Sequence, residues 1–230
     1  MTVLAAMGGE NEQRFDGIAE NWNHEVPAFN TLAVECIAAP DAALLPRVPG
    51  LSDKLFQSDG TMTKQEVRAA TLAKLMPMRG ALLWDIGCGS GSVAIEWMRA
   101  ARYARAIGIE PRADRRAMAG ANALALGAPK LQVIDGEVPQ ALDGLDKPDA
   151  IFIGGGLSEE TVAASLAALR PLGRLVANAV TLESETQLIA LHKQHGGELV
   201  KIMVHRAEPV GRLTGWRPAM PVTQWSLVKR

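Results

Sequence analysis

The sequence has few cysteines, few aromatic residues and no long apolar segment. Cys36 and Cys88 are the only cysteines in 230 residues, and no His or Cys stands beside either at metal-ligand spacing. This pattern argues against a disulfide scaffold and against a zinc site. Apolar runs such as residues 81–84 fall far short of the roughly 20 residues that a membrane-spanning helix needs, and no basic stretch precedes an apolar one at the N-terminus. We therefore expect a soluble, cytoplasmic protein.

Neither sign of charge is in excess, but the two signs are separated along the chain. The net charge is −1, from 24 basic and 25 acidic residues. The first 50 residues are mainly acidic, whereas residues 201–230 are mainly basic. A basic end suits an anionic ligand, and an ordinary solvated surface is an equally good reading. With 4% aromatic residues and an almost neutral total, the chain offers little of the stacking and basic surface that RNA recognition uses.

After about residue 60 the chain alternates between strand-like and helix-like segments. Residues 63–66 have the S/T-x-x-E spacing of a capping box, which predicts a helix that begins there and stops near Pro77. The strand candidates are residues 81–86, 104–110, 131–135, 150–153, 173–179, 198–206 and 222–229. The helix candidates that lie between them are residues 92–101, 111–126, 159–169 and 183–195. This order predicts an α/β fold with a mainly parallel sheet of seven strands covered on both faces.

The two ends of the chain depart from this alternation. Residues 198–206 and 222–229 are joined by a segment without helical period, so we expect an antiparallel hairpin at one edge of the sheet. Residues 1–50 hold one strand candidate, residues 30–38, followed by a linker with three prolines. So few periodic segments cannot close a core of their own. We therefore expect two domains, residues 1–50 and 51–230, with the first largely mobile.

The strongest motif is an acid followed by three glycines at alternate positions, between a strand and a helix. It comprises Asp85, Gly87, Gly89 and Gly91. Glycines there allow a tight turn and close approach of a ligand to the backbone, and a helix start favours an anionic group. Glu110 ends the next strand, where a carboxylate can accept hydrogen bonds from ribose hydroxyls. Together they indicate a ligand that carries adenosine.

The spacing of the motif separates the classes of nucleotide-binding protein. A dinucleotide-binding loop needs Gly three residues after Gly89, and the sequence has Ser92 there. A phosphate-binding P-loop needs a lysine that this loop lacks. The acid-x-Gly-x-Gly-x-Gly pattern instead resembles motif I of the class I S-adenosylmethionine-dependent methyltransferases, a Rossmann-like family whose sheet also ends in an antiparallel hairpin.

Four motifs in sequence order make the resemblance more specific. They are residues 62–68 (MTKQEVR), 85–96 (DIGCGSGSVAIE), 136–139 (GEVP) and 152–156 (FIGGG). As a set they resemble the C-terminal domain of the precorrin-6Y methyltransferase family of cobalamin biosynthesis. Residues 2–12 and 30–36 resemble the end of the tetrapyrrole-methylase domain that is fused upstream in that family. The resemblance implies that residues 1–50 are a remnant of this domain plus a linker.

The resemblance also implies a reaction. The C-terminal domain of the family methylates carbon 15 of a precorrin-6B type tetrapyrrole and removes the carboxyl group of the carbon 12 acetate. The N-terminal domain, which methylates carbon 5, is mostly missing from this chain. The family further implies a homotetramer. The sequence does not say whether the substrate carries cobalt, although the upstream remnant resembles the metal-free route, nor in which order methylation and decarboxylation occur.

Site residues follow from the resemblance by position. Residues 87–91 should wrap the methionine part of the cofactor, Asp85 should orient this loop or meet the ammonium group, and Glu110 should hold the ribose. Val138 stands where the family usually has Ala. The full set of expected cofactor-binding residues is Thr63, Asp85, Gly87, Cys88, Gly89, Ser90, Gly91, Glu110, Glu137 and Val138. Each residue also has a purely structural interpretation. Thr63 would then simply cap a helix, and Cys88 would be a small packing residue, since no basic residue adjoins it.

Substrate-binding residues are expected in two places. Gly154, Gly155 and Gly156 would form the floor between the sulfonium and the substrate. Arg206, Arg212 and Arg217 would bind the substrate's carboxylates, because a guanidinium can hold a carboxylate through two hydrogen bonds.

Three other functions remain open from the sequence. One is a class I methyltransferase that acts on RNA or another small molecule. A second is a non-catalytic subunit that keeps the cofactor fold, which loss of the glycine loop or of Glu110 would have indicated. A third is a nicotinamide dehydrogenase, disfavoured by Ser92 and by the terminal hairpin.

Overall fold

The computed structural model describes residues 1–42 and 44–230. It divides into two units, Met1–Leu44 and Leu45–Arg230. The boundary lies between Leu44 and Leu45, a few residues before the boundary after residue 50 that the sequence predicted. None of the helices in the described part of the chain is long and apolar enough to cross a membrane.

The N-terminal unit is a small antiparallel sheet. Its strands are β1 (Thr2–Ala5), β2 (Gln13–Asp16) and β3 (Asn30–Ala33), in the order β2-β1-β3, with a short 3₁₀ helix over Ala19–Asn21. Val3 and Ala5 of β1 are buried, whereas β3 is exposed along its whole length. The sequence predicted one strand here and missed β1 and β2. Mobility of this unit stays a prediction.

The larger unit is a seven-stranded α/β sandwich. Its strands are β4 (Leu82–Ile86), β5 (Arg105–Ile109), β6 (Gln132–Ile134), β7 (Ala150–Ile153), β8 (Arg174–Ala179), β9 (Glu198–Ile202) and β12 (Val222–Val228). Its helices are α1 (Gln65–Leu75), α2 (Ser92–Ala100), α3 (Ala113–Ala125), α4 (Glu159–Ala168) and α5 (Leu182–His195), with 3₁₀ turns at Asp53–Leu55 and Gln140–Leu142. The sheet order is β6-β5-β4-β7-β8-β12-β9. This confirms the expected fold class.

The sheet is parallel except for β12. That strand pairs antiparallel with both β8 and β9, with Trp225 opposite Ala177 on one side and Leu199 on the other. The predicted pairing of the last two sheet strands is therefore confirmed, and β9 forms the edge.

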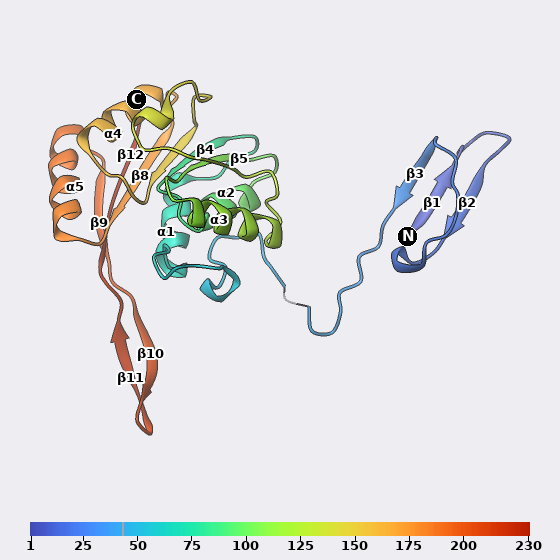
Figure 1. Cartoon of the computed structure of the whole chain (residues 1–230), viewed down its shortest axis with the longest axis horizontal. Helices are drawn as coiled ribbons and strands as arrows, with labels where there is room; N and C mark the ends of the chain where they lie inside the picture. Colours follow the sequence, from blue (N-terminus) through green and yellow to red (C-terminus); the bar gives the residue numbers. More distant parts are fainter. Residues whose placement is uncertain (43) are drawn as a thin grey trace. The chain divides into compact units, whose positions relative to one another are not determined.

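Alternate side chains of the central strand β4 pack on opposite faces of the sheet. Leu82, Trp84 and Ile86 pack into the core that includes residues of α4 and α5, whereas Leu83 packs against α1 and α2. Successive side chains of a strand point to opposite faces, and β4 is buried on both. Figure 1 shows the helices divided between the two faces in this way.

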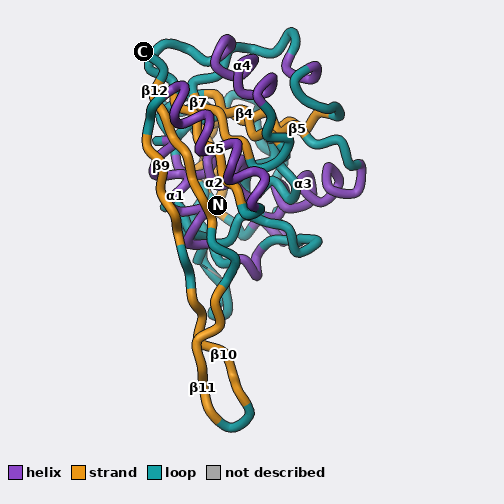
Figure 2. Tube along the Cα trace, turned by 90° about the vertical axis from the view of Figure 1, so that its left-hand side faces the viewer, coloured by secondary structure: helices purple, strands orange, loops and turns teal. Residues whose placement is uncertain are grey.

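A second hairpin projects from the sheet, which the sequence did not predict. Strands β10 (His205–Val210) and β11 (Leu213–Pro218) pair only with each other and form an arm between β9 and β12 (Figures 1 and 2). Gly211 turns the chain with a φ of +61°. Most of the arm's side chains are exposed, so no buried alternation marks its strands in the sequence.

The start of α1 also differs from the prediction. Lys64 rather than Thr63 is the N-cap residue, and no side chain caps the helix. The expected capping box is therefore wrong. Thr63 lies one residue further out and lines two cavities instead.

Candidate cofactor and substrate site

A cavity of about 520 Å³ lies where β4, β5 and β7 end. In parallel sheets the loops that follow the carboxyl ends of the strands form the ligand crevice. Most of the residues that the sequence assigned to the cofactor line this cavity: Thr63, Asp85, Gly87, Cys88, Gly89, Ser90, Glu110, Glu137 and Val138. Four segments that are distant in sequence thus meet at one place.

The glycine loop after β4 is shaped by close backbone contact with the loop after β7. Gly87 has a φ of +69°, and a Cβ built on it would lie 2.7 Å from the backbone nitrogen and Cα of Gly155. The amides of Gly87 and Cys88 donate to the carbonyl of Ile109, at 2.9 and 3.1 Å. Glycine is required at position 87 both by its conformation and by this contact.

Asp85 presents one carboxylate oxygen that has no partner. Its Oδ2 accepts a hydrogen bond from the Ala94 amide at 2.9 Å, which ties the strand to the start of α2. Its Oδ1 is buried, and no other described residue bonds to it. Burial, and secondarily the nearby charge of Glu110, raises the pKa of Asp85 to about 7. The residue is therefore suited to a cationic hydrogen-bond donor in the cavity.

Glu110 braces the glycine loop from the end of β5. Its carboxylate accepts from the Gly89 amide at 3.0 Å and from the Arg112 amide at 3.1 Å. Each oxygen has one such bond, so each keeps capacity for a further donor from a ligand. The side chain is buried.

The remaining residues of the glycine loop have different surroundings. Burial is the main cause that raises the pKa of the Cys88 thiol, so it stays protonated at neutral pH, consistent with a packing residue. The Oγ of Ser90 is buried and, among the described residues, finds no partner. Gly91 does not line the cavity; with a φ of +77° it starts α2, and a Cβ there would lie 3.1 Å from the Cβ of Ala119 in α3.

The three glycines after β7 all line the same cavity. Gly156 has a φ of +68°, and a Cβ on it would lie 2.9 Å from a methyl group of Val138. The loops after β6 and β7 are therefore in contact, which brings Val138 beside the expected substrate floor.

A second cavity of about 530 Å³ adjoins the first. Thr61, Met62, Thr63 and Gly154 line both cavities. The second cavity is formed by the start of α1, the ends of β8 and β9, and the base of the arm. Its apolar lining includes Met62, Val67, Val180, Ile202, Val204, Met220 and Val222, and its basic residues are Lys64, Arg206 and Arg217.

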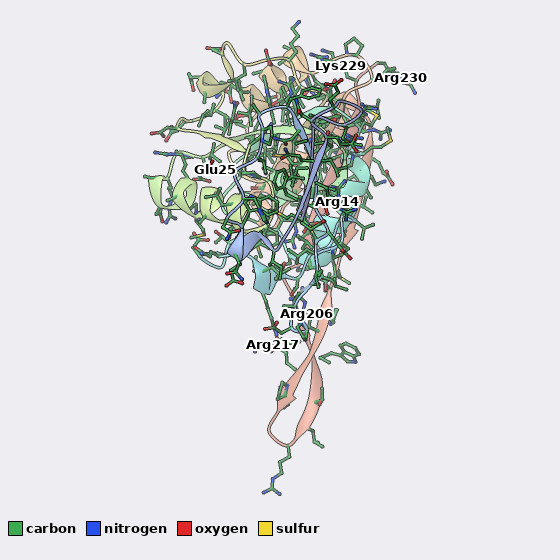
Figure 3. All side chains as sticks on the ribbon, turned by 90° about the vertical axis from the view of Figure 1, so that its right-hand side faces the viewer. Arg14, Glu25, Arg206, Arg217, Lys229 and Arg230 are labelled. Carbon is green, nitrogen blue, oxygen red and sulfur yellow. The ribbon has the colours of Figure 1, made fainter. Side chains whose placement is uncertain are left out.

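The structure brings together two of the three arginines that the sequence assigned to the substrate. Arg206 and Arg217 face each other in the register of β10 and β11, at the base of the arm (Figure 3). Arg206 bonds to Glu66 at 2.6 Å and to Asp53 at 3.3 Å, and Arg217 bonds to Glu208 at 2.9 Å. Arg212 lies in the turn at the far end of the arm and lines neither cavity.

The sequence missed several cavity residues. Ser158 and Thr161 line the first cavity and begin α4, where the Ser158 hydroxyl accepts from the Thr161 amide at 3.1 Å. A serine followed by two glutamates, the usual start of a helix, could have indicated Ser158. Phe152, the first residue of the FIGGG motif, also lines it, as does Thr61, which no local pattern marks. Among residues 1–42 and 44–230, no group of three or more His, Cys, Asp or Glu side chains could hold a metal ion.

Comparison with known proteins agrees with this geometry. Residues 54–229 match the family model of the precorrin methyltransferase domain. A precorrin-6Y C(5,15)-methyltransferase [decarboxylating] from Sinorhizobium sp is 51% identical over 231 residues, which cover all of this chain and 56% of the relative. A probable cobalt-precorrin-6B C(15)-methyltransferase (decarboxylating) from Pyrobaculum calidifontis is 34% identical over 76% of this chain and 93% of its own length.

Solved structures give the same result. The crystal structure of the C-terminal domain of precorrin-6Y C5,15-methyltransferase from Rhodobacter capsulatus is 48% identical and superposes with a TM-score of 0.76, covering 80% of this chain and 100% of that domain. The chain spans little more than half the length of the full-length precorrin-6Y relatives. From the extent of the family match and these identities, the chain belongs to the precorrin methyltransferase domain family.

Proposed function

We propose that this chain binds S-adenosylmethionine in the first cavity and methylates a precorrin-6B type tetrapyrrole held in the second, at carbon 15, with decarboxylation of the carbon 12 acetate. The observation that carries the proposal is the shared wall of Thr61, Met62, Thr63 and Gly154. A methyl group can pass between two ligands only if their sites adjoin, and these two cavities do. The names of the relatives supply the substrate class.

The residues of the first cavity fit the cofactor. The free Oδ1 of Asp85 suits the ammonium group of the methionine part, and Glu110 suits the ribose hydroxyls. The cofactor supplies an already activated methyl group, so the protein needs no strong base for the transfer. Its residues instead orient the two ligands, because in-line geometry dominates the rate of such a step.

The second cavity fits a large, partly apolar ligand with several carboxylates. Its apolar walls suit the macrocycle, and its three cations suit the carboxylate arms. Arg206 and Arg217 are already paired with acidic side chains. A substrate carboxylate would therefore share these guanidinium groups with Glu66 and Glu208, which also line the cavity, or replace them.

The test is to incubate the chain with S-adenosylmethionine and a precorrin-6B type substrate and to follow the product's mass. We expect the gain of one methyl group and the loss of one carbon dioxide. Arg206→Gln and Arg217→Gln, each as a single variant, should raise the substrate KM by roughly tenfold. Arg212→Gln is the matched control, because it removes the same charge from the same arm outside both cavities.

Two outcomes would count against the proposal. Tight cofactor binding without any change in substrate mass would move the function to another substrate. An equal effect of all three arginine variants would show that the arm's net charge, rather than the second cavity, attracts the substrate.

The position of this chain within a longer protein belongs to the same proposal. Because the relatives extend well beyond the matched region, we propose that Met1–Leu44 is the end of a tetrapyrrole-methylase domain. The exposed β3 supports this, since a three-stranded sheet with one bare strand needs further packing partners. Methylation of carbon 5 is not assigned to this chain.

We also propose a homotetramer and a cytoplasmic location. The arm supports the first, because Val210, Leu213 and Trp216 are between 66% and 78% exposed and would be covered by another subunit. The free thiols of Cys36 and Cys88 support the second, since a reducing compartment would keep them unpaired.

A further inference from the structure

Residues 50–63, here called the strap, cross from the start of the larger unit to the two cavities. Apart from a single 3₁₀ turn at Asp53–Leu55 the strap has no regular structure. Its last three residues, Thr61, Met62 and Thr63, form part of the wall between the first and second cavities. A segment without helix or strand needs other partners for its backbone groups, and these partners fix its position.

The first set of partners is a buried ion pair between Arg68 of α1 and Glu96 of α2. Arg68 is completely buried, and its Nε donates to Glu96 at 2.6 Å. The same guanidinium donates to the carbonyls of Leu51 and Thr63, at the two ends of the strap. Glu96 accepts from the amides of Gly50 and Leu51 at 2.6 and 3.0 Å. Most of the pair's other hydrogen bonds thus go to strap backbone.

The second partner is Asn122 of α3, which joins the strap to the glycine loop. Its Oδ1 accepts from the Gln57 amide at 2.8 Å, and its Nδ2 donates to the Gln57 carbonyl at 2.9 Å. Nδ2 also donates to the carbonyl of Ser90 at 2.9 Å. Asn122 is 1% exposed. One side chain therefore fixes the strap relative to the loop that lines the first cavity.

Apolar contacts complete the attachment. Leu51, Phe56 and Met62 of the strap are buried in one cluster with Ile95 of α2 and Ala123 of α3. The strap is consequently held along its length by the same helices that follow β4 and β5.

We propose that Asn122 and Arg68 are positioning residues: they fix the strap so that Thr61, Met62 and Thr63 set the alignment between the two cavities. This rests on the proposed function, in which the methyl group crosses that wall. Neither side chain lines either cavity, so both act through the strap. Since a misplacement of about 1 Å can cost on the order of 100-fold in rate, the turnover number should be more sensitive than cofactor affinity.

The test compares Asn122→Ala with Leu188→Ala in the full chain. Leu188 is completely buried in the core on the α5 side of the sheet and lines neither cavity, so its truncation lowers stability without touching the strap. We would measure hydrogen exchange over residues 50–63, the Kd for S-adenosylhomocysteine, and kcat. Arg68→Lys is a third variant that keeps the charge facing Glu96 and loses the forked contact with both strap ends.

We expect Asn122→Ala and Arg68→Lys to raise exchange in the strap, to lower kcat by roughly 10- to 100-fold and to change the Kd less. Leu188→Ala should leave all three quantities near those of the parent chain under conditions where it is folded. Unchanged strap exchange in both strap variants, or an equal loss of kcat in Leu188→Ala, would overturn the inference. Hydrogen exchange and S-adenosylhomocysteine binding need no tetrapyrrole. These two measurements therefore test the positioning role of Asn122 and Arg68 even if the parent chain proves inactive on precorrin.

Discussion

Asp85 combines burial, one satisfied oxygen and one free oxygen in a single carboxylate. The sequence could place this residue in the motif, but it could not show that its Oδ1 lacks a partner, because that depends on α2, which uses Oδ2 alone. The same holds for Asn122, an asparagine within an alanine-rich helix that no motif marks. Its importance comes from two segments that are distant in sequence.

A prediction about pH follows from Asp85. Because its pKa in the free folded chain is raised to about 7, its contribution to the free energy of unfolding is full below about pH 4 and is lost as the pH rises through 7. Thermal unfolding should therefore show Asp85→Asn gaining stability relative to the parent chain between about pH 5 and about pH 8.

Ligand binding should show the opposite dependence. If the ionised carboxylate meets the ammonium group, affinity for S-adenosylhomocysteine should rise roughly tenfold between about pH 6 and about pH 8 in the parent chain. Titration calorimetry should find a flat profile in Asp85→Asn. The same rise in both proteins would mean that another group carries it.

At the scale of elements, the strands that the sequence located best are those buried on both faces. Residues 150–153 were predicted with the bounds that the structure gives to β7, and β4 differs by one residue at its start. The antiparallel pair of β9 and β12 was predicted. The arm formed by β10 and β11, which lies between them in the sequence, was missed. The arm is stabilised by pairing between its own strands, which leaves no burial pattern to read.

The contact between the glycine loops gives a second prediction. Gly87→Ala would force a left-handed φ on alanine and place its Cβ 2.7 Å from the backbone of Gly155. We expect a loss of stability of at least about 1 kcal/mol and loss of measurable binding to S-adenosylhomocysteine, checked by chemical denaturation and calorimetry.

Gly120→Ala is the matched control. Gly120 lies within α3, its φ is ordinary, and a Cβ there would meet nothing within 4 Å. The free energy of unfolding of this variant should rise by about 0.5–1 kcal/mol, and its affinity for S-adenosylhomocysteine should equal that of the parent chain. If both substitutions had the same effect, the backbone contact would not be the cause.

At the scale of the whole molecule, the larger unit has its own sheet, its own apolar core clusters and both cavities. We therefore predict that a chain of residues 45–230 folds and keeps the parent's affinity for S-adenosylhomocysteine within about threefold. Circular dichroism and calorimetry would check this. A large loss of affinity would show that the N-terminal unit contributes to the site.

The exposed arm gives a prediction about assembly. Leu213→Ser/Trp216→Ser should lower the mass measured by analytical ultracentrifugation, since each substitution removes apolar area that another subunit would bury. Leu124→Ser on α3, which is 71% exposed and away from the arm, should leave the mass unchanged. If the mass stayed the same in all variants, the arm would not be the interface.

The anchoring of the strap has a mechanical consequence for a two-unit chain. Arg99 donates to the carbonyls of Leu45 and Pro46, and Glu96 holds the amides of Gly50 and Leu51, directly after the boundary between the units. Any pull on the backbone from the N-terminal side reaches these fixed points before it reaches Thr61. Displacement of the backbone before Leu45 should therefore be resisted at these hydrogen bonds, before it changes the wall between the two cavities.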